Sequence, residues 1–117
     1  MTQDKQGTPV AVTRNEAEHR FEISYPDTGE LGGFAQYLDH GGERIFYHTE
    51  VPEKFGGRGL ASILIGEALN ATTAEQTGIV AVCPFVKGYL EKKGHQGQHR
   101  PGTTSDLKVL EEKLGGL

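Results

Sequence analysis

Three glycines stand among four residues in "KFGGRGLA", residues 54–61, just before a helix-like pattern. Gly56, Gly57 and Gly59 have no side chains, so the backbone there can approach a partner closely, at a cost in chain entropy. The first amides of a helix lack intrahelical acceptors, and the helix dipole adds about half a positive charge at that end. A glycine-rich loop at a helix start is therefore suited to bind an anion such as a phosphate.

Two common phosphate motifs do not match this loop. The P-loop requires G-x-x-x-x-G-K followed by Ser or Thr, and the chain contains no such run. The dinucleotide pattern G-x-G-x-x-G also fails, because Gly57 and Gly59 are followed by Ser62 where a third glycine is needed. The glycines alone leave two interpretations open, a phosphate cradle or a flexible turn that only reverses the chain.

Cys83 is a candidate for chemistry at the end of a predicted buried strand. It closes the β-rich run "TGIVAVC" and precedes Pro84, so we predict that it is the N-cap of a helix. Partial positive charge at a helix N-terminus favours the thiolate form of a cysteine. The alternative is that Cys83 is a small apolar filler.

His48 and Glu50 are candidates for a general base. Alternation along a strand places both on one face together with Phe46. Either could accept a proton directly or through water, and a structural role for the histidine is the alternative. The remaining histidines show no metal-ligand spacing with one another or with Cys83, so we predict no metal site.

The composition is that of a one-domain globular protein. Over 117 residues, 35% are hydrophobic and 24% charged, enough for one modest core. The formal charge of -4 gives no overall attraction to nucleic acid or to an anionic membrane. No apolar run approaches the roughly 20 residues of a membrane-spanning helix, and "MTQDKQGTPV" lacks a signal-peptide core. A single cysteine excludes an intramolecular disulfide and fits a reducing compartment, so we expect a cytoplasmic protein.

The first half of the chain predicts four strands with tight turns. They are expected at residues 10–14, 19–25, 31–40 and 43–51. In the second, Phe21, Ile23 and Tyr25 alternate with polar residues, which is the period of a half-buried strand. The "HGGE" between the last two is a hairpin signal. Four consecutive strands joined in this way form an antiparallel meander.

The second half predicts helix, strand and helix. Helical spacing of apolar residues indicates a helix at 59–72, a continuous β-rich run indicates a buried strand at 77–83, and a second helix follows at 84–93. Because strand, crossover helix and strand form a right-handed unit, the fourth and fifth strands should be parallel. The predicted fold class is α/β (α+β).

The two ends of the chain are expected to lie outside the main domain, residues 9–95. Residues 1–8 are polar and expected to be frayed. Residues 96–117 are expected to form a linker and a short helix capped by Ser105. That helix is too short to be stable alone in water, so we expect it to dock on its own domain in a monomer, with a dimer as the alternative. Its apolar stripe consists of Leu107, Leu110 and Leu114.

The glycine loop resembles the pyrophosphate loop of the GNAT N-acetyltransferase superfamily. That pattern is Gln or Arg, two residues, Gly, one residue, then Gly or Ala, at the end of strand four. Gly57 and Gly59 match, and Lys54 stands at the first position. The predicted order of strands and helices is also that of the superfamily. "HTEVP", the loop and "CPFVKGYLEKKGHQ" together resemble its short YjdJ-type single-domain branch.

The resemblance implies acetyl-coenzyme A as ligand and an amine as acceptor. Strands four and five of the superfamily splay apart, the pantetheine arm lies in the gap, and the loop amides hold the pyrophosphate. The cofactor-binding residues implied here are Val51, Lys54, Phe55, Gly56, Gly57, Arg58, Gly59, Leu60, Ala61 and Tyr89. For Lys54 and Arg58, which could add charge at the rim, a solvated surface role is the alternative.

The usual proton donor of the superfamily, a tyrosine in the helix after strand five, is displaced here. Tyr89 stands one place before that position, and Leu90 occupies it. One position turns a side chain by about 100° around a helix. We therefore assign Tyr89 to packing or cofactor contact, and take Cys83, His48 and Glu50 as the catalytic candidates.

The sequence thus predicts an acetyl-CoA-dependent N-acetyltransferase acting on a small amine, a peptide or a protein lysine. A coenzyme A-binding sensor or interaction module without catalysis is the alternative. A third possibility is an interaction domain that binds no ligand. In that case the glycines of the loop would serve only to reverse the chain.

Overall fold

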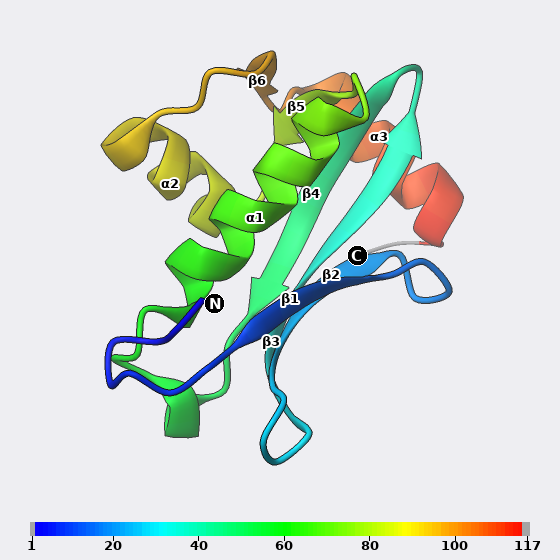
Figure 1. Ribbon diagram of the computed structural model, residues 1–117. Coiled ribbons are helices and arrows are strands. Elements are labelled where there is room, and N and C mark those ends of the chain that lie inside the picture. Colours follow the sequence, from blue (N-terminus) through cyan, green and yellow to red (C-terminus); the bar gives the residue numbers. More distant parts are fainter. Residues whose placement is uncertain (1, 116–117) are drawn as a thin grey trace.

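The computed structural model describes residues 2–115 as one six-stranded sheet with helices on both faces (Figure 1). The strands are β1 (Ala11–Asn15), β2 (Arg20–Tyr25), β3 (Glu30–His40), β4 (Glu43–Glu50), β5 (Gly78–Ala81) and β6 (His99–Pro101). The helices are α1 (Leu60–Ala74), α2 (Pro84–Lys93) and α3 (Thr104–Leu114), with a short 3-10 turn at Glu53–Phe55.

The strands lie in sequence order across the sheet, from β1 to β6. The first four form the predicted antiparallel meander, and β5 pairs with β4 in parallel, as the crossover through α1 requires. The α+β fold and the order of its elements are confirmed.

One strand was not predicted. β6 lies within residues 96–104, which we expected to be a linker, and pairs in parallel with β5 from Ile79↔His99 to Ala81↔Pro101. Three residues carry no alternation that a sequence pattern can detect, and a proline argues against a strand except at an edge. β6 is such an edge strand, so Pro101 is tolerated there.

The main core lies between the sheet and helices α1 and α2. Phe21 and Phe46 of the sheet stack at 6.2 Å between ring centres, beneath Leu64 and Leu69 of α1. Val86 brings the start of α2 into the same cluster. Both helices are thus held on one face of the sheet.

Helix α3 packs on the opposite face of the sheet. Leu110 is fully buried against Ile45 and Val80, and Val109 packs beside it. The predicted intramolecular docking is therefore observed, but the predicted stripe is wrong, because Leu107 and Leu114 are exposed. Helix α3 therefore docks through a narrow contact centred on Leu110.

The cap of α3 also differs from the prediction. The N-cap is Thr103 rather than Ser105, and Thr103 and Asp106 form a reciprocal capping box. Asp106 further accepts two hydrogen bonds from Arg100 at 2.8 and 3.0 Å, and Arg100 also binds Glu43 of β4. Asp106 therefore connects α3 to both β6 and β4.

We expect Asp106→Ala to lower the free energy of unfolding by about 2 kcal/mol at neutral pH, because it removes a cap and charge-assisted bonds. Arg100 and Thr103 hold the pKa of Asp106 at about 2, below the roughly 3.9 of an unfolded aspartate. A depressed folded pKa stabilises the fold above the unfolded pKa, and that contribution is lost as the pH falls through about 2.

Denaturant unfolding at pH 7, 4 and 2 measures this contribution. The gap between wild type and Asp106→Ala should shrink toward pH 2. Glu112→Ala, on the exposed side of the same helix, is the matched control and should unfold like the wild type at pH 7. A gap of equal size at pH 7 and pH 2 would contradict the assignment.

Residues 2–9, the N-terminal strap, are ordered rather than frayed. The amide of Val10 donates to the carbonyl of Thr2, and Gln3 bridges to Pro9. Burial disfavours the charge of Asp4, but hydrogen bonds from Tyr25 and from the amides of Thr8 and Gln6 lower its pKa. The strap runs beside the start of α1 (Figure 1).

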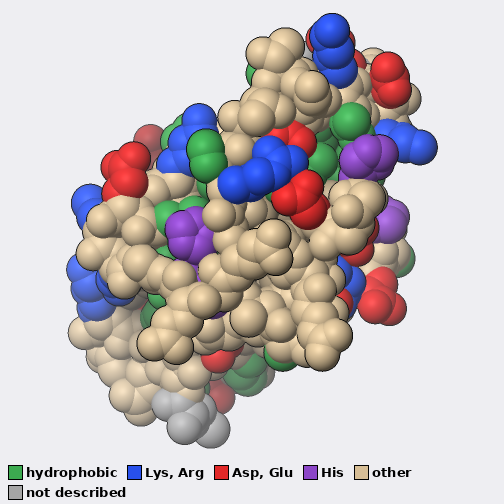
Figure 2. Space-filling model, turned by 90° about the horizontal axis from the view of Figure 1, so that it is seen from above, with side chains coloured by type: hydrophobic (Ala, Val, Ile, Leu, Met, Phe, Trp, Pro, Cys, Tyr) green, Lys and Arg blue, Asp and Glu red, His purple; other side chains and the backbone are tan. Residues whose placement is uncertain are grey.

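Charges of both signs are mixed at the end of the molecule seen from above. Figure 2 shows Lys and Arg side chains next to Asp and Glu side chains there, with histidines between them. This view shows no large patch of one sign, consistent with pairs such as Arg100 with Glu43.

Candidate functional site

β4 and β5 separate halfway along β4. Their pairing ends at Phe46↔Ala81, where the amides of Val82 and Cys83 both donate to the Phe46 carbonyl, at 3.1 and 2.9 Å. The chain then enters α2, while β4 continues to Glu50 paired with β3 on its other side. The predicted divergence of the fourth and fifth strands is present, and it leads toward the glycine loop.

A β-bulge at Tyr47 changes which β4 side chains face the core. His48 pairs with Gln36 and Phe46 with Tyr37, so Tyr47 has no partner in the register. The alternation that we expected to place His48 and Glu50 with Phe46 is therefore broken.

His48 and Glu50 lie on the opposite face from Phe46. Their side chains are about half exposed, with 3.7 Å between Nε2 and Oε1, and the His48 ring lies 6.0 Å from that of Phe34. Thr49 is buried instead, although strict alternation would have turned His48 and Glu50 toward the core. The two candidate bases thus stay together, exposed to solvent on the same face of the sheet as α3.

Cys83 bridges the two diverging strands. It is the N-cap of α2, as predicted, and only 1% exposed. Its thiol donates a hydrogen bond to the Thr49 hydroxyl of β4, with 3.2 Å between Sγ and Oγ1. Thr49 was not predicted as a site residue, since an unmarked threonine on a strand gives no signal before the bulge is known.

The glycine loop presents free amides at the start of α1. Gly57 and Gly59 have φ angles of +74° and +76°, which favour glycine, and Gly59 is the N-cap. Within the described chain, the amide of Gly56 donates to the carbonyl of Glu53, and the next amide with a backbone acceptor is that of Ile63, which donates to Gly59. The amides of residues 57–62 are therefore available to an external acceptor.

The charged and aromatic loop residues have defined partners. Phe55 is buried and stacks on Tyr25 at 5.4 Å, while Arg58 donates to the Tyr25 hydroxyl at 3.2 Å. Lys54 pairs with Glu30 at 2.7 Å and lowers the pKa of that carboxyl. These contacts fix the shape of the loop, and contact of these three residues with a ligand stays a prediction.

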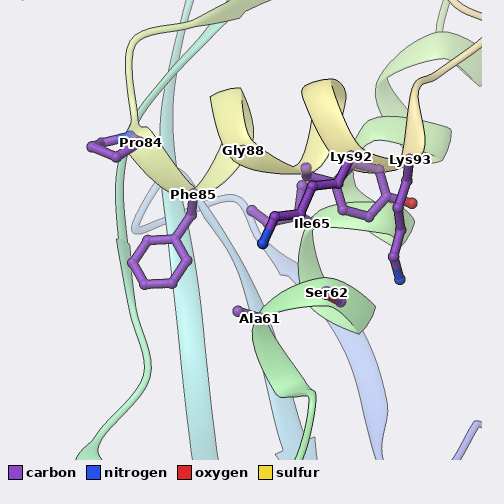
Figure 3. Close-up of a pocket in the computed structure, with 9 residues that line it drawn as sticks. Ala61, Ser62, Ile65, Pro84, Phe85, Gly88, Lys92 and Lys93 are labelled. Carbon is purple, nitrogen blue, oxygen red and sulfur yellow. The ribbon is translucent and has the colours of Figure 1, made fainter.

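A groove of about 330 Å³ runs between α1 and α2, and we call it the α1–α2 groove (Figure 3). Lys92 and Lys93 extend from the end of α2 toward the first turn of α1, where Ser62 lies (Figure 3). The other lining residues include Ala61, Ile65, Pro84, Phe85 and Gly88. The groove thus runs along α2 from Pro84, the residue after Cys83, to Lys93, and faces the first turns of α1.

Tyr89 also lines the groove and packs against α1. A Cβ atom on Gly66 would lie only 2.9 Å from the Tyr89 hydroxyl, so a larger residue there would require the tyrosine ring to shift. Leu90, at the usual tyrosine position, packs against the core instead. Tyr89 therefore packs against α1, and its contact with a cofactor stays a prediction.

Two other classes of site, membrane-spanning helices and metal centres, are absent from residues 2–115. No described helix combines the length and apolar character needed to cross a membrane. The same residues contain no cluster of three His, Cys, Asp or Glu that could hold a metal ion.

Comparison with known proteins identifies the family of the chain through one family model. No curated protein matches the chain. The model of one family, described as GCN5-related N-acetyl-transferase, matches residues 20–99, which include the diverging strands, the glycine loop, the groove and Cys83. The chain therefore belongs to the GCN5-related N-acetyltransferase family.

Proposed function

We propose that this protein transfers the acetyl group of acetyl-coenzyme A to an amine. The observation that carries the proposal is the divergence of β4 from β5, with Cys83 between the strands and the free amides of residues 57–62 beyond their ends. Family membership supports the same reaction class. Assignment to the short YjdJ-type branch is part of this proposal.

The residues present fit coenzyme A. In the proposed complex, the amides of residues 57–62 bind the pyrophosphate, because they have no backbone acceptor in the described chain and stand at the positive end of a 15-residue helix. Val51, directly after β4, contacts the pantetheine arm. The α1–α2 groove provides apolar walls, and bound acetyl-CoA would supply the activated thioester.

The chemical step requires a proton acceptor and a proton donor. We assign proton removal from the acceptor amine to His48 or Glu50, directly or through water, because both side chains are exposed to solvent. The nitrogen–carbon bond forms, the carbon–sulfur bond breaks, and Cys83 protonates the departing thiolate. In the structure Cys83 already acts as a hydrogen-bond donor, to Thr49.

The burial of Cys83 and the presence of Leu90 at the usual tyrosine position keep the alternative open, a coenzyme A-binding module without catalysis. A turnover assay with acetyl-CoA and a panel of amines, polyamines and lysine peptides distinguishes the two. Thiol release with an acetylated product supports the enzyme. Tight coenzyme A binding with no product from any acceptor supports the module.

Gly88→Phe tests whether the groove holds the coenzyme. A Cβ atom at Gly88 would meet no atom within 4 Å, and Gly88 lines the groove, so a larger side chain there should project into the groove rather than into the core. We expect the affinity for acetyl-CoA, measured by calorimetry, to fall at least about tenfold. The melting temperature should be unchanged or higher, because glycine destabilises a helix interior by about 1 kcal/mol.

Glu91→Phe, on the same helix but outside the groove, is the matched control and should bind normally. Wild-type affinity in a folded Gly88→Phe protein would place the coenzyme elsewhere.

A further inference from the structure

The N-terminal strap forms one wall of a second hollow, of about 430 Å³, at the start of α1. We call it the strap pocket. Lys5 and Gly59 line it, and so do Ser62 and Lys93, which also line the α1–α2 groove. The two hollows therefore meet at Ser62 and Lys93, on either side of the first turn of α1.

The fold holds Lys5 in place at this pocket. Its amide donates to the carbonyl of Arg58 at 2.9 Å, which joins the strap to the glycine loop. Its side chain lies along Gly59, where an added Cβ atom would be 3.1 Å from Lys5 Cε. Lys5 thus reaches the pocket from a backbone position that the loop itself fixes.

The lysines of the pocket carry charge that the described protein does not neutralise. No carboxylate of the described residues lies within salt-bridge distance of Lys5 or Lys93, whereas Lys54 nearby pairs with Glu30. The carboxylate of Asp4, also in the wall, already accepts hydrogen bonds from Tyr25 and from two strap amides. The chain as a whole is negative, at -4, so this positive charge is local.

Coenzyme A carries two separate phosphate groups, the pyrophosphate and the 3'-phosphate of its adenosine. With the pyrophosphate on the amides of residues 57–62 and the pantetheine arm directed to Cys83, the adenosine must leave on the other side of the loop. The strap pocket lies there and offers two lysines. We infer that Lys5 and Lys93 bind the 3'-phosphate, so that the protein distinguishes coenzyme A from its 3'-dephospho form.

This inference rests on the proposed function, because it assumes the pyrophosphate position. It assigns the strap, which lies outside the residues matched by the family model, to the binding site. Charge-assisted contacts from two lysines should favour coenzyme A over 3'-dephospho-coenzyme A by about tenfold, which corresponds to about 1.4 kcal/mol.

Calorimetric titration with the two ligands tests the inference on the full-length chain. Lys5→Gln and Lys93→Gln should each weaken the binding of coenzyme A more than that of 3'-dephospho-coenzyme A, and so reduce the preference. Lys87→Gln, on α2 outside both hollows, is the control and should keep the wild-type preference. The preference should also weaken with added salt.

Equal binding of the two ligands by the wild type would overturn the inference and leave the proposed function standing. An unchanged preference in both lysine variants would also overturn it. Failure of both ligands to bind the wild type would contradict the proposed function and the inference together.

Discussion

Replacing Cys83 with alanine should reduce kcat for acetyl transfer by about a hundredfold or more, while the affinity for acetyl-CoA changes little. Positioned proton transfer contributes about 10²- to 10⁴-fold to such reactions. The thiol lies between the diverging strands, 3.2 Å from the Thr49 hydroxyl, and is the donor in that contact. Cys83→Ser should fall between wild type and alanine, because a hydroxyl keeps the hydrogen bond but is a weaker acid.

Val86→Ala is the matched control for packing. Val86 is fully buried on the same turn of α2, so its truncation loosens the same core without touching the thiol. We expect this variant to have a clearly lower melting temperature and a kcat close to that of the wild type. Steady-state rates and thermal melts of all three variants separate the two effects. Full turnover in a folded Cys83→Ala protein would show that the cysteine has only a packing role.

The second large effect is expected at the glycine loop. Gly57→Glu and Gly59→Glu should weaken coenzyme A binding by two to three orders of magnitude, because like charges in contact cost several kcal/mol. At Gly57 an added side chain meets no protein atom within 4 Å, so the loss would come from the ligand. At Gly59 it also displaces Lys5.

Gly42→Glu controls for backbone strain in this experiment. Gly42 has a φ angle of +80° and free space around it, like Gly57, but lies in the β3–β4 turn at the far end of β4 from the loop. The variant should lose similar stability and keep its affinity for coenzyme A by calorimetry. If the loop variants fold and bind like this control, the pyrophosphate assignment is wrong.

The elements that could be predicted are those with long, regular patterns. The meander, α1 and the parallel β5 each follow several apolar residues at one period, and Pro84 and Gly94 mark the ends of α2. β6 has three residues and no period, and its place depends on the pairing with β5, which is a tertiary contact. The cap of α3 was misplaced by two residues because Thr103, Thr104 and Ser105 are all acceptable caps.

The candidate site was predictable only in part. The glycine loop and the N-cap position of Cys83 follow from local sequence and appear in the structure. The bulge at Tyr47 has no local signal, yet it moves His48 and Glu50 to the face opposite Phe46 and brings Thr49 to Cys83. The strap was missed for a similar reason, since its order depends on Asp4 binding Tyr25, 21 positions away.

The position of the strap matters for how this protein should be produced. Any affinity tag or fusion partner joined ahead of Thr2 would begin beside the strap pocket, where it could compete for Lys5 or hold the strap away from α1. Kinetic constants obtained with an uncleaved tag at that end would then describe an altered protein. A tag joined beyond α3 would leave from the opposite face of the sheet, which makes the carboxyl end the better site for purification handles.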